Sequence, residues 1–597
     1  MLMNRNFLLL AAISILAAGF GGCSLLRELN AEQCQVNADC SKFGNYECSS
    51  EKVCVASAVS SAGATNGGSA SGGKGGGGSG GTSDTTPGGQ GGSPPQDECS
   101  ENADCIDAHD GAPYICQRGS CVSLTLEEHC PYVIAGTDAA PTDYLTRAGR
   151  PIIFGAYVPI DVAMPEGHPY TLNYRFALSE FMDGTLGGVG TPARPFVMVL
   201  CQSTKPNLKA SVSHLVDTLE VPAILATLGS KDLKTVFDDV STRERKVFLL
   251  GPFEADSALA AADDGGRMWH MLGPATDLIP TYGPLLSLVE KYYRGVRSTP
   301  AGTNLKVAVV HTDLTYSADM ANALPSAVTV NGATLDAKAN KDNYQRFEVK
   351  VDGVPNPDTG VTTAALKTFN PDIVISLGGT EFIDPILKDF QAAHTINNTP
   401  FYVLSPRNAF DQTLTNGSLF VTANYLDQLM AGVNYASVED SSLYDSYLEA
   451  IQTAYPGQEG LESRENLYDA AYFMMYALAA ANFTGTDFDG DDVVNGMKAL
   501  VDPDGEPATV GPGKNGTMFS KVLAILKTGG GKVALTGTLG PPDFNPLTGA
   551  RKSPGSVWCL ARPDRKVAFD KLRLVEGPPA SLKQADGDSF CFNNFFP

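Results

Sequence analysis

The fold is decided by a series of short apolar stretches that begins with IIFGAYV at residues 152–158. These stretches are often β-branched, as strands buried on both faces of a sheet must be. The later members of the series lie at residues 196–200, 223–228, 247–250, 305–310 and 373–377. The series predicts that most of the chain beyond about residue 131 is built on buried strands.

Between the predicted strands lie stretches in which apolar residues recur at helical spacing. Residues 207–219 place leucine and valine side chains on one helical stripe, and residues 285–293 and 467–481 behave similarly. Strands that alternate with helices predict parallel sheets built from βαβ units. The fold class is therefore α/β with parallel sheets.

Composition limits the kinds of partner that this chain can have. Its 597 residues and 43% hydrophobic content can bury a large core and leave room for several domains. The 43 Lys and Arg against 66 Asp and Glu give a net charge of −23, which repels phosphate backbones. Nucleic acid is excluded as an expected partner.

The first 23 residues read as an export signal. Arg5 supplies the positive element, residues 7–20 form an apolar run, and two glycines precede Cys23. The run is too short for a comfortable membrane span. A small-residue site ending in a cysteine resembles the lipobox of bacterial lipoproteins, which implies lipidation of Cys23. An ordinary secretory signal followed by a chance cysteine is the alternative.

Cysteine usage supports export. The chain has 13 cysteines, and removing Cys23 leaves 12, an even number that suits disulfides in an oxidising compartment. Eight of them form two clusters that share an Asn-Ala-Asp-Cys motif: Cys34, Cys40, Cys48 and Cys54, then Cys99, Cys105, Cys116 and Cys121. We interpret residues 30–56 and 99–122 as two copies of one disulfide-rich module.

The pairing within each module stays open, because four cysteines allow three pairings. A zinc site is the competing interpretation, but neither cluster contains a Cys-x2-Cys pair, so we expect no metal. Residues 57–98, between the modules, are dominated by Gly, Ser and Thr and predict a flexible linker. As a random coil its ends would lie about 35 Å apart.

The order of the segments from residue 150 to residue 562 resembles that of type I periplasmic solute-binding proteins, especially leucine/isoleucine/valine-binding proteins. The resemblance is carried by several segments in order: the strand at residues 153–159, the Gly-rich turn at 183–190, the strand at 196–200, residues 221–230, residues 246–257, residues 305–316 with its Tyr-bearing loop, residues 370–379, and Tyr468-Asp-Ala-Ala471. Each is short and common, and their order and spacing carry the resemblance.

The resemblance implies two doubly wound α/β lobes with parallel sheets that close on a ligand like a clamshell, preceded by the disulfide-rich modules. It places lobe 1 at residues 131–276 and 407–525, and lobe 2 at residues 277–406 and 526–597. It implies no cofactor and no catalysis.

The resemblance also implies which loops of lobe 1 face the ligand. Gly229 would let the ligand approach the backbone and Ser230 would offer a hydroxyl, although Ser230 could equally cap the next helix. The second loop carries bulky and acidic residues where amino-acid binders have small ones. Its predicted ligand-contacting residues are Phe253, Glu254, Ala255 and Asp256.

In lobe 2 the resemblance places Tyr316 against the ligand, with Thr380 and Glu381 facing it from the next strand end. A solvated surface position is the alternative for Glu381. Ser405 and Arg407 lie near where amino-acid binders place an acid that neutralises the ammonium group. An arginine there would attract a carboxylate or another anion, unless Arg407 forms a salt bridge at the crossover.

Several partial matches to catalytic or metal-binding motifs lack a required residue or lie in the wrong structural context. Residues 184–190 are Gly-rich but lie after a helix and before a strand, so they predict a turn and not a phosphate-binding loop. The acidic run at residues 487–492 lacks the glycine and the glutamate of an EF-hand and predicts a helix cap. The one Gly-x-Ser-x-Gly match, residues 77–81, falls in the linker. We expect no enzyme activity.

Four cysteines remain within or near the predicted lobes. We predict that Cys559 pairs with Cys591 and joins the C-terminal tail to the last strands, and that Cys130 pairs with Cys201. The expected localisation is the cell envelope, facing the periplasm or the exterior.

Two functions follow from these observations. The first is a lipid-anchored receptor that captures a small polar solute, an amino acid or a carboxylate-like molecule, for an ABC permease. The alternative is a sensory or adhesion protein that uses the same clamshell to report on a ligand or a partner through a membrane sensor. The modules and the long linker favour the alternative more than a plain transporter component would.

Overall fold

The computed structural model describes residues 46–48, residues 54–56 and, with short gaps, residues 99–584. The gaps in the last range are residues 137–139, 160–166, 205–207, 255, 261, 301, 353, 355–356, 411–413, 415–418, 420–424, 436–441, 459, 462–463, 486, 514–515, 553–554, 562–565 and 576–580. The chain divides into two units, residues 1–91 and residues 92–597.

The described residues of the first unit form an antiparallel strand pair. Strands β1 (Tyr46–Cys48) and β2 (Cys54–Ala56) place Cys48 opposite Cys54. The predicted lipidation site Cys23, the cysteines Cys34 and Cys40 and the predicted linker lie outside the described residues.

Lobe 1, in the second unit, is built on a six-stranded sheet with the order β10-β9-β8-β6-β7-β5. Its strands are β5 (Tyr132–Ile134), β6 (Ile152–Val158), β7 (Phe196–Gln202), β8 (Ala223–Ala226), β9 (Phe248–Glu254) and β10 (Met268–Leu272). All neighbouring strands are parallel except β5, which pairs antiparallel with β7 at the edge. The predicted strand at residues 152–158 is confirmed with the same bounds.

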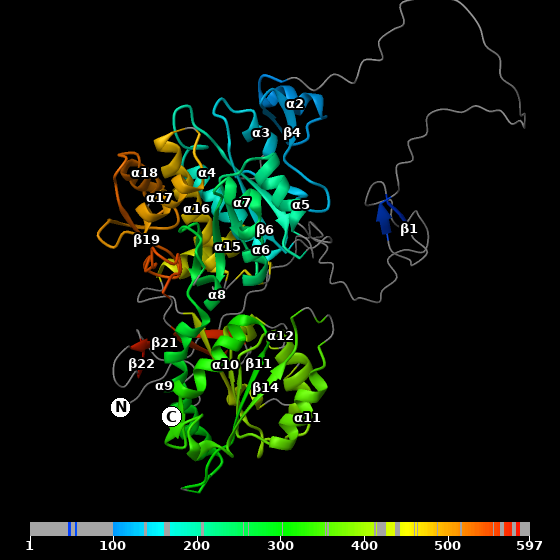
Figure 1. The fold of residues 1–597 in the computed structure, drawn as a ribbon, viewed down its shortest axis with the longest axis vertical. Helices are drawn as coiled ribbons and strands as arrows, with labels where there is room; N and C mark the ends of the chain where they lie inside the picture. The colour runs from blue at the N-terminus through cyan, green and yellow to red at the C-terminus, as the bar shows by residue number, and fades with distance from the viewer. Residues whose placement is uncertain are drawn as a thin grey trace, which may run out of the picture. The chain divides into compact units, whose positions relative to one another are not determined.

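Helices cover both faces of this sheet (Figure 1). They are α3 (Pro141–Leu145), α4 (Pro169–Gly184), α5 (Lys209–Val212), the π-helix η2 (Ser213–Thr218), α6 (Ser230–Asp238), α7 (Val240–Glu244), α8 (Ser257–Ala260), α15 (Ser442–Ala454), α16 (Glu465–Thr484), α17 (Gly490–Leu500) and α18 (Thr517–Leu526). On one face, Phe181 of α4 packs edge-on against Phe196. On the other, a Cβ added to Gly155 would lie 2.7 Å from a terminal side-chain carbon of Leu215, so η2 packs closely on the sheet at this glycine.

Lobe 2 is built on an eight-stranded sheet with the order β14-β11-β15-β16-β17-β20-β21-β22. Its strands are β11 (Val307–Thr312), β14 (Tyr344–Val349), β15 (Ile373–Ser376), β16 (Phe401–Leu404), β17 (Met430–Tyr435), β20 (Gly555–Ala561), β21 (Lys566–Val575) and β22 (Ser581–Gln584). The first five are parallel to their neighbours, and the last three run antiparallel.

The helical segments of lobe 2 pack on both faces of its sheet (Figure 1). They are η3 (Ala275–Leu278), α9 (Ile279–Val296), α10 (Thr315–Ala327), η4 (Lys338–Asn340), α11 (Thr359–Phe369), α12 (Thr380–Phe382), η5 (Ile383–Leu387), α13 (Lys388–Gln391), η6 (Pro406–Phe410) and η8 (Leu426–Leu429). Buried residues of β11 alternate between two apolar clusters. Val307 and Val309 belong to the cluster that includes α9 and α10, whereas Ala308 and Val310 belong to the cluster that includes α11 and α13.

The sheets correct the predicted lobe boundaries. Strand β17 pairs with β16, so residues 407–435 belong to lobe 2 and not to lobe 1. The predicted start of the last segment of lobe 2, residue 526, is also wrong. Strand β19 (Val533–Thr536) pairs with β18 (Glu506–Thr509), and residues 537–551 contact lobe 1 through Asp469 and His270. The chain therefore returns to lobe 2 only just before β20.

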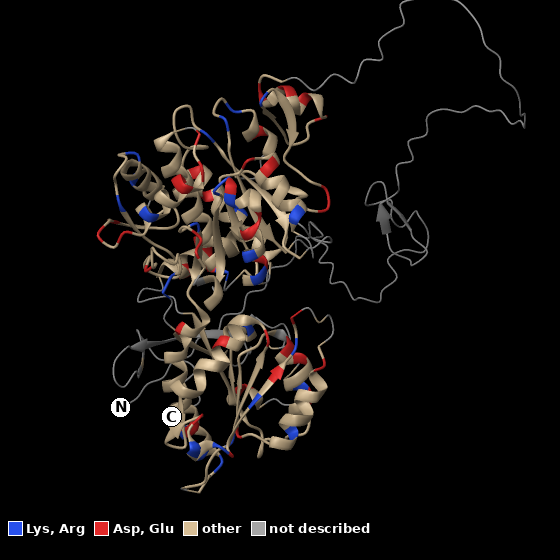
Figure 2. Ribbon diagram, in the orientation of Figure 1, with Lys and Arg blue, Asp and Glu red and all other residues tan. Residues whose placement is uncertain are grey.

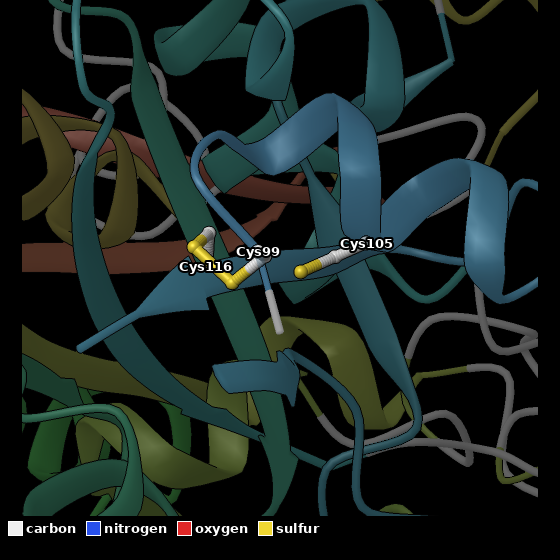
Figure 3. Close-up of side chains that lie close together, drawn as sticks. All are labelled: Cys99, Cys105 and Cys116. Atoms are coloured by element: carbon white, nitrogen blue, oxygen red, sulfur yellow. A yellow bond between two sulfur atoms is a disulfide. The ribbon is translucent and has the colours of Figure 1, made fainter. Parts of the chain in front are cut away.

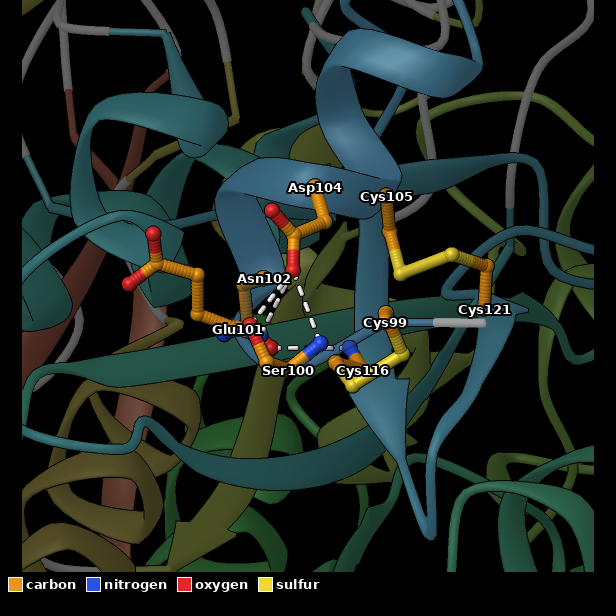
Figure 4. The surroundings of a disulfide bond; sticks show 8 residues. All are labelled: Cys99, Ser100, Glu101, Asn102, Asp104, Cys105, Cys116 and Cys121. Atoms are coloured by element: carbon orange, nitrogen blue, oxygen red, sulfur yellow. Dashed lines mark hydrogen bonds between the residues drawn. A yellow bond between two sulfur atoms is a disulfide. The ribbon is translucent and has the colours of Figure 1, made fainter. Parts of the chain in front are cut away.

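The second disulfide-rich module consists of α2 (Asn102–Ala108) and the hairpin β3 (Tyr114–Gln117) and β4 (Ser120–Ser123). Cys99 pairs with Cys116 and Cys105 pairs with Cys121, which resolves the pairing that the sequence left open (Figure 4). The Sγ atoms of Cys99, Cys105 and Cys116 lie within 4.8 Å of one another (Figure 3). They meet because two disulfides lie side by side, and a disulfide sulfur is not the thiolate that binds zinc.

The module packs on lobe 1 and does not hang free from it. Asn102 donates from Nδ2 to the carbonyl of Leu145 at 2.9 Å, and Arg118 forms an ion pair with Glu220 at 2.6 Å. Ile106 and Ile115 of the module are buried in the core that it shares with lobe 1. The module and lobe 1 therefore form one packed body.

The remaining cysteines agree with the predicted pairing where the structure describes them. Cys130 forms a disulfide with Cys201, as predicted. Cys559 is disulfide-bonded, and its predicted partner Cys591 lies outside the described residues. In the described part of the chain no helix is long and apolar enough to cross a membrane. Acidic and basic residues are interspersed over both lobes (Figure 2).

Candidate functional site

The candidate site is a cleft of about 470 Å³ where loops and helix starts of the two lobes meet. It is lined by Tyr170, Gly229, Phe253, Leu272, Leu314, Tyr316, Gly379, Glu381, Pro406, Arg407, Asn434, Tyr435, Arg464, Glu465, Asn466 and Leu539. A volume of this size lies within the range of small-molecule sites, and most of its lining is apolar or aromatic. Many of these residues follow the carboxyl ends of parallel strands, where α/β proteins bind their ligands.

Lobe 1 contributes a backbone surface and an aromatic wall. Gly229 follows β8, precedes α6 and has open space where a Cβ would be. Phe253, at the end of β9, packs edge-on against Tyr170 with ring centroids 6.0 Å apart. These positions let a ligand approach the backbone at one side and an aromatic pair at the other.

Two predicted ligand contacts of lobe 1 do not line the cleft. Ser230 is the first residue of α6, and Gly229, not Ser230, occupies the cap position, so the alternative of a Ser230 cap is wrong. Asp256 is buried and accepts a hydrogen bond at 2.8 Å from the amide of Leu259, which stabilises the start of α8. Ala255 and the side chain of Glu254 lie outside the described residues.

Lobe 2 contributes a stacked Tyr–Arg pair. The guanidinium carbon of Arg407 lies 3.8 Å from the ring centroid of Tyr316, which fits a cation–π contact. Ser317, next along α10, is buried. Its Oγ accepts from the amide of Thr312 and donates to the carbonyl of Leu377, so it joins the ends of β11 and β15 and orients Tyr316.

The loop after β15 is held by buried hydrogen bonds. Ser405 Oγ donates to the carbonyl of Gly378 at 2.5 Å, and Asn408 Nδ2 donates to the carbonyl of Gly379 at 2.7 Å. Glu381 Oε1 accepts from the Gly379 amide and lines the cleft. Ser405 therefore positions the loop and lines only a small adjoining pocket of about 30 Å³. The side chain of Thr380 is not described.

The start of α16 brings a second set of charged groups that the sequence reasoning missed. Arg464 lies over Tyr170, with its guanidinium carbon 5.0 Å from the ring centroid. Glu465 follows it on the cleft wall, where burial raises the pKa of its carboxyl to about 7. Asn466 Nδ2 donates to the carbonyl of Pro252 at 2.8 Å and ties α16 to the end of β9.

A buried carboxylate supports this wall from behind. Asp469, one turn along α16, accepts from the amide and the hydroxyl of Thr538 at 2.9 Å and from the amide of Leu539 at 3.0 Å. Arg551 is buried nearby and donates to the carbonyls of Leu539 and Pro541. These bonds hold the loop that brings Leu539 to the cleft.

Sequence signals for the missed residues were weak. Arg464 and Glu465 directly precede the helix predicted at residues 467–481, and a charged pair at that place usually reads as a solvated helix start. Tyr170 begins a helix far from any predicted binding loop. The motif Tyr468-Asp-Ala-Ala471, part of the resemblance, lies within about one helical turn of Arg464 and Glu465. Its position could have indicated that these two residues lie near the site.

Fold and cleft together define a two-lobed α/β binding protein. The family model described as periplasmic binding protein matches residues 201–525. The chain therefore belongs to the periplasmic binding protein family. No curated protein matches the chain.

Two solved structures are similar to this chain at low sequence identity. A solute binding protein of an ABC transporter from Rhodopseudomonas palustris BisB5, in complex with 3,4-dihydroxy benzoic acid, is 13% identical over 72% of this chain and 98% of its own, with a TM-score of 0.49. A leucine binding protein from Thermotoga maritima is 11% identical over 70% of this chain and 97% of its own, with a TM-score of 0.47. At these identities and TM-scores the two likenesses support no inference about this chain.

Proposed function

We propose that this protein is an extracytoplasmic, lipid-anchored solute-binding protein that captures a small polar ligand between its two lobes and delivers it to an ABC transporter. The ligand is an amino acid or another carboxylate-bearing molecule. The observation that carries the proposal is the cleft of about 470 Å³, which is lined by Arg407, stacked on Tyr316, and by the open backbone at Gly229. A positive group over an aromatic ring, beside exposed backbone, suits a small anion.

Charge and shape in the cleft favour a carboxylate over a sugar or a cation. Arg407 and Arg464 are contributed by different lobes and both line the cleft. A ligand with one carboxylate can satisfy a guanidinium fork, and its apolar part can lie against Tyr170, Phe253 or Tyr316. The binding role requires no catalytic group, and the proposed protein is not an enzyme.

The proposed location follows from the N-terminus and the family. Residues 1–23 carry the lipoprotein-like signal, and Cys23 is the proposed lipidation site. Lipid attachment at Cys23 and the linker at residues 57–98 would hold the binding lobes near a membrane while letting them move relative to it. The partner for transport would be a permease in that membrane.

A sensory or adhesion role is the second candidate, and the packing of the second module on lobe 1 favours it. Ion pairs and hydrogen bonds join Arg118 and Asn102 of the module to lobe 1. Because the module moves with lobe 1, lobe closure would displace it relative to lobe 2, and a partner bound to the module could sense that displacement.

The first experiment is a thermal-shift screen of residues 24–597 against amino acids, carboxylates, sugars and peptides. A ligand that binds only the folded state raises the melting temperature by mass action. We expect hits among carboxylates and loss of the shift in Tyr316→Ala. Hits confined to uncharged sugars would contradict the carboxylate assignment, and no hit at all would favour the partner-binding role.

A further inference from the structure

Glu465 is an acidic group of the cleft wall whose burial disfavours a negative charge. It lines the cleft at the start of α16, and its Oε2 is buried with no hydrogen-bond partner in the described part of the chain. A buried carboxylate oxygen without a donor is costly when charged, and the cost falls when the group carries a proton.

The charged and titratable groups around Glu465 come from several elements. On α16 itself, Arg464 precedes it with a positive charge and Asp469 follows one turn later with a negative charge. From α15, the hydroxyl of Tyr447 lies near enough for the two groups to influence each other's ionisation. Across the cleft, Arg407 and Glu381 line the same space. Glu465 is thus placed between two positive and two negative groups.

We propose that Glu465 contacts the ligand in its protonated form, and that this contact makes the cleft select an anionic carboxylate with an aromatic or apolar body. The assignment rests on the proposed solute-binding function and names its ligand class. With Glu465 neutral, the charged cleft side chains Arg407, Arg464 and Glu381 sum to one positive charge, which matches one carboxylate. With Glu465 ionised the sum is zero and the attraction is lost.

A protonated carboxyl also supplies a hydrogen bond that an ionised one cannot. Its hydroxyl donates to a carboxylate oxygen of the ligand, in a charge-assisted bond. The rings of Tyr170, Phe253 and Tyr316 line the same cleft and provide flat apolar surface for the rest of the ligand. The ligand would be held by a guanidinium group from lobe 2 and by the Glu465 proton from lobe 1.

The ionisation of Glu465 makes the affinity for an anion depend on pH. Burial is the largest cause of its raised pKa, and the charge of Asp469 adds to it. A hydrogen bond from the backbone amide of Glu465 and the charge of Arg464 act against the rise. Since the pKa is about 7, the proton is present below neutral pH and is lost above it. If only the protonated cleft binds, affinity for an anion falls about tenfold between about pH 6 and about pH 8.

The first test needs no ligand and compares the melting temperature of the wild-type chain, residues 24–597, with that of Glu465→Gln across pH. In the unfolded chain Glu465 ionises near its ordinary pKa, whereas in the folded chain it stays neutral until about pH 7. Wild type should therefore lose stability relative to Glu465→Gln as pH rises from about 4.5 to about 7. Glu449→Gln, an exposed site on α15, is the matched control and should show no such trend. A difference that stays flat with pH would refute the protonated state.

The second test measures benzoate binding by calorimetry, with benzamide as the uncharged probe. Benzoate stays ionised over the whole range, so any pH dependence comes from the protein. We expect wild-type affinity to fall about tenfold from about pH 6 to about pH 8, and Glu465→Gln to bind with little pH dependence. Parallel pH profiles in the two proteins would overturn the role of Glu465. Failure of benzoate at every pH would overturn the ligand class, while hits in the thermal-shift screen would still support the solute-binding function.

Discussion

At the scale of single residues, we expect Arg407, positioned by Tyr316, to contribute most to binding of the ligand. The guanidinium group lies 3.8 Å from the ring centroid of Tyr316, so the ring fixes the position of the charge. Replacing Arg407 by Met keeps much of the side-chain volume and removes the charge. Hydrogen bonds to charged groups contribute about 1.5–3 kcal/mol, so affinity for a carboxylate should fall about 10- to 150-fold.

Calorimetry with a carboxylate found in the screen would measure the effect of Arg407→Met. The control is Arg150→Met, because Arg150 is exposed and precedes the amino end of β6, whereas the cleft lies at carboxyl ends of strands. Equal affinities for wild type and Arg407→Met would show that the charge at this position does not bind the ligand.

Asp469 is expected to govern stability more than binding. Its carboxylate accepts three hydrogen bonds from Thr538 and Leu539. Its negative charge also stabilises the buried positive charge of Arg551. Asn in its place turns one acceptor oxygen into a donor that faces an amide N–H. We expect Asp469→Asn to lower the free energy of unfolding by about 2–4 kcal/mol, measured by urea denaturation. Asp491→Asn, an exposed ion pair with Lys246, should cost less than about 1 kcal/mol.

The resemblance to solute-binding proteins predicted part of the candidate site and missed the rest for a physical reason. Tyr316, Arg407, Gly229, Phe253 and Glu381 were predicted and line the cleft. Position after a strand indicates that a residue is near the ligand edge, but it does not determine where the side chain points. Asp256 lies in such a loop and instead turns inward to an amide of α8.

At the scale of elements, the strand pairs of the two disulfide-rich modules have the same register. The disulfide pairing seen in the second module therefore predicts the pairing in the first. In the second module the first cysteine pairs with the third and the second with the fourth. The third and fourth cysteines lie opposite each other across an antiparallel pair in both modules, as Cys48 with Cys54 and Cys116 with Cys121. We therefore predict Cys34–Cys48 and Cys40–Cys54 in the first module.

Digestion under non-reducing conditions followed by mass spectrometry would test this pairing. The second module provides an internal control, because its two disulfides must appear in the same digest. Peptides linked through Cys48 and Cys54 would contradict the shared connectivity.

Secondary structure was predicted correctly where a strand is buried on both faces. It was predicted incorrectly where contacts with distant segments determine the local structure. Residues 152–158 and 373–377 read as apolar runs and form β6 and β15, the latter within one residue. Residues 207–219 were predicted as one helix and form α5 followed by the π-helix η2. Strand β17 (Met430–Tyr435) was missed because it contains Gly432, and glycine disfavours a strand prediction. The glycine is needed because β20 pairs with β17 and places the Trp558 ring against this position, which the local sequence does not show.

At the scale of the whole second unit, a few polar contacts join the lobes outside the cleft. Lys231 of α6 forms an ion pair with Asp352 at 2.9 Å, and the amide of Ser257 donates to Asp319 of α10 at 3.2 Å. The Lys231 and Asp352 side chains are 75% and 46% exposed, so the pair contributes at most about 1 kcal/mol. Lys231→Ala should weaken ligand binding by no more than about fivefold, since the pair forms only where the lobes meet.

Titration calorimetry at low salt and at high salt would measure this contribution, because screening weakens exposed pairs. Lys388→Ala removes an exposed pair within one segment of lobe 2 and is the matched control. A loss of a hundredfold or more in Lys231→Ala would mean that closure depends on this pair and not on the cleft.

The interleaving of the lobes along the chain also bears on how the protein is made. The sheet of lobe 1 is complete at residue 272, but α16, which packs against that sheet, begins only at residue 465, after most of lobe 2. A chain emerging from the ribosome or from a membrane translocon would leave the apolar surface that α16 covers exposed during that interval. Early termination would therefore give an aggregating fragment and not a smaller receptor, and export would depend on chaperones that shield the first sheet until the later helices arrive.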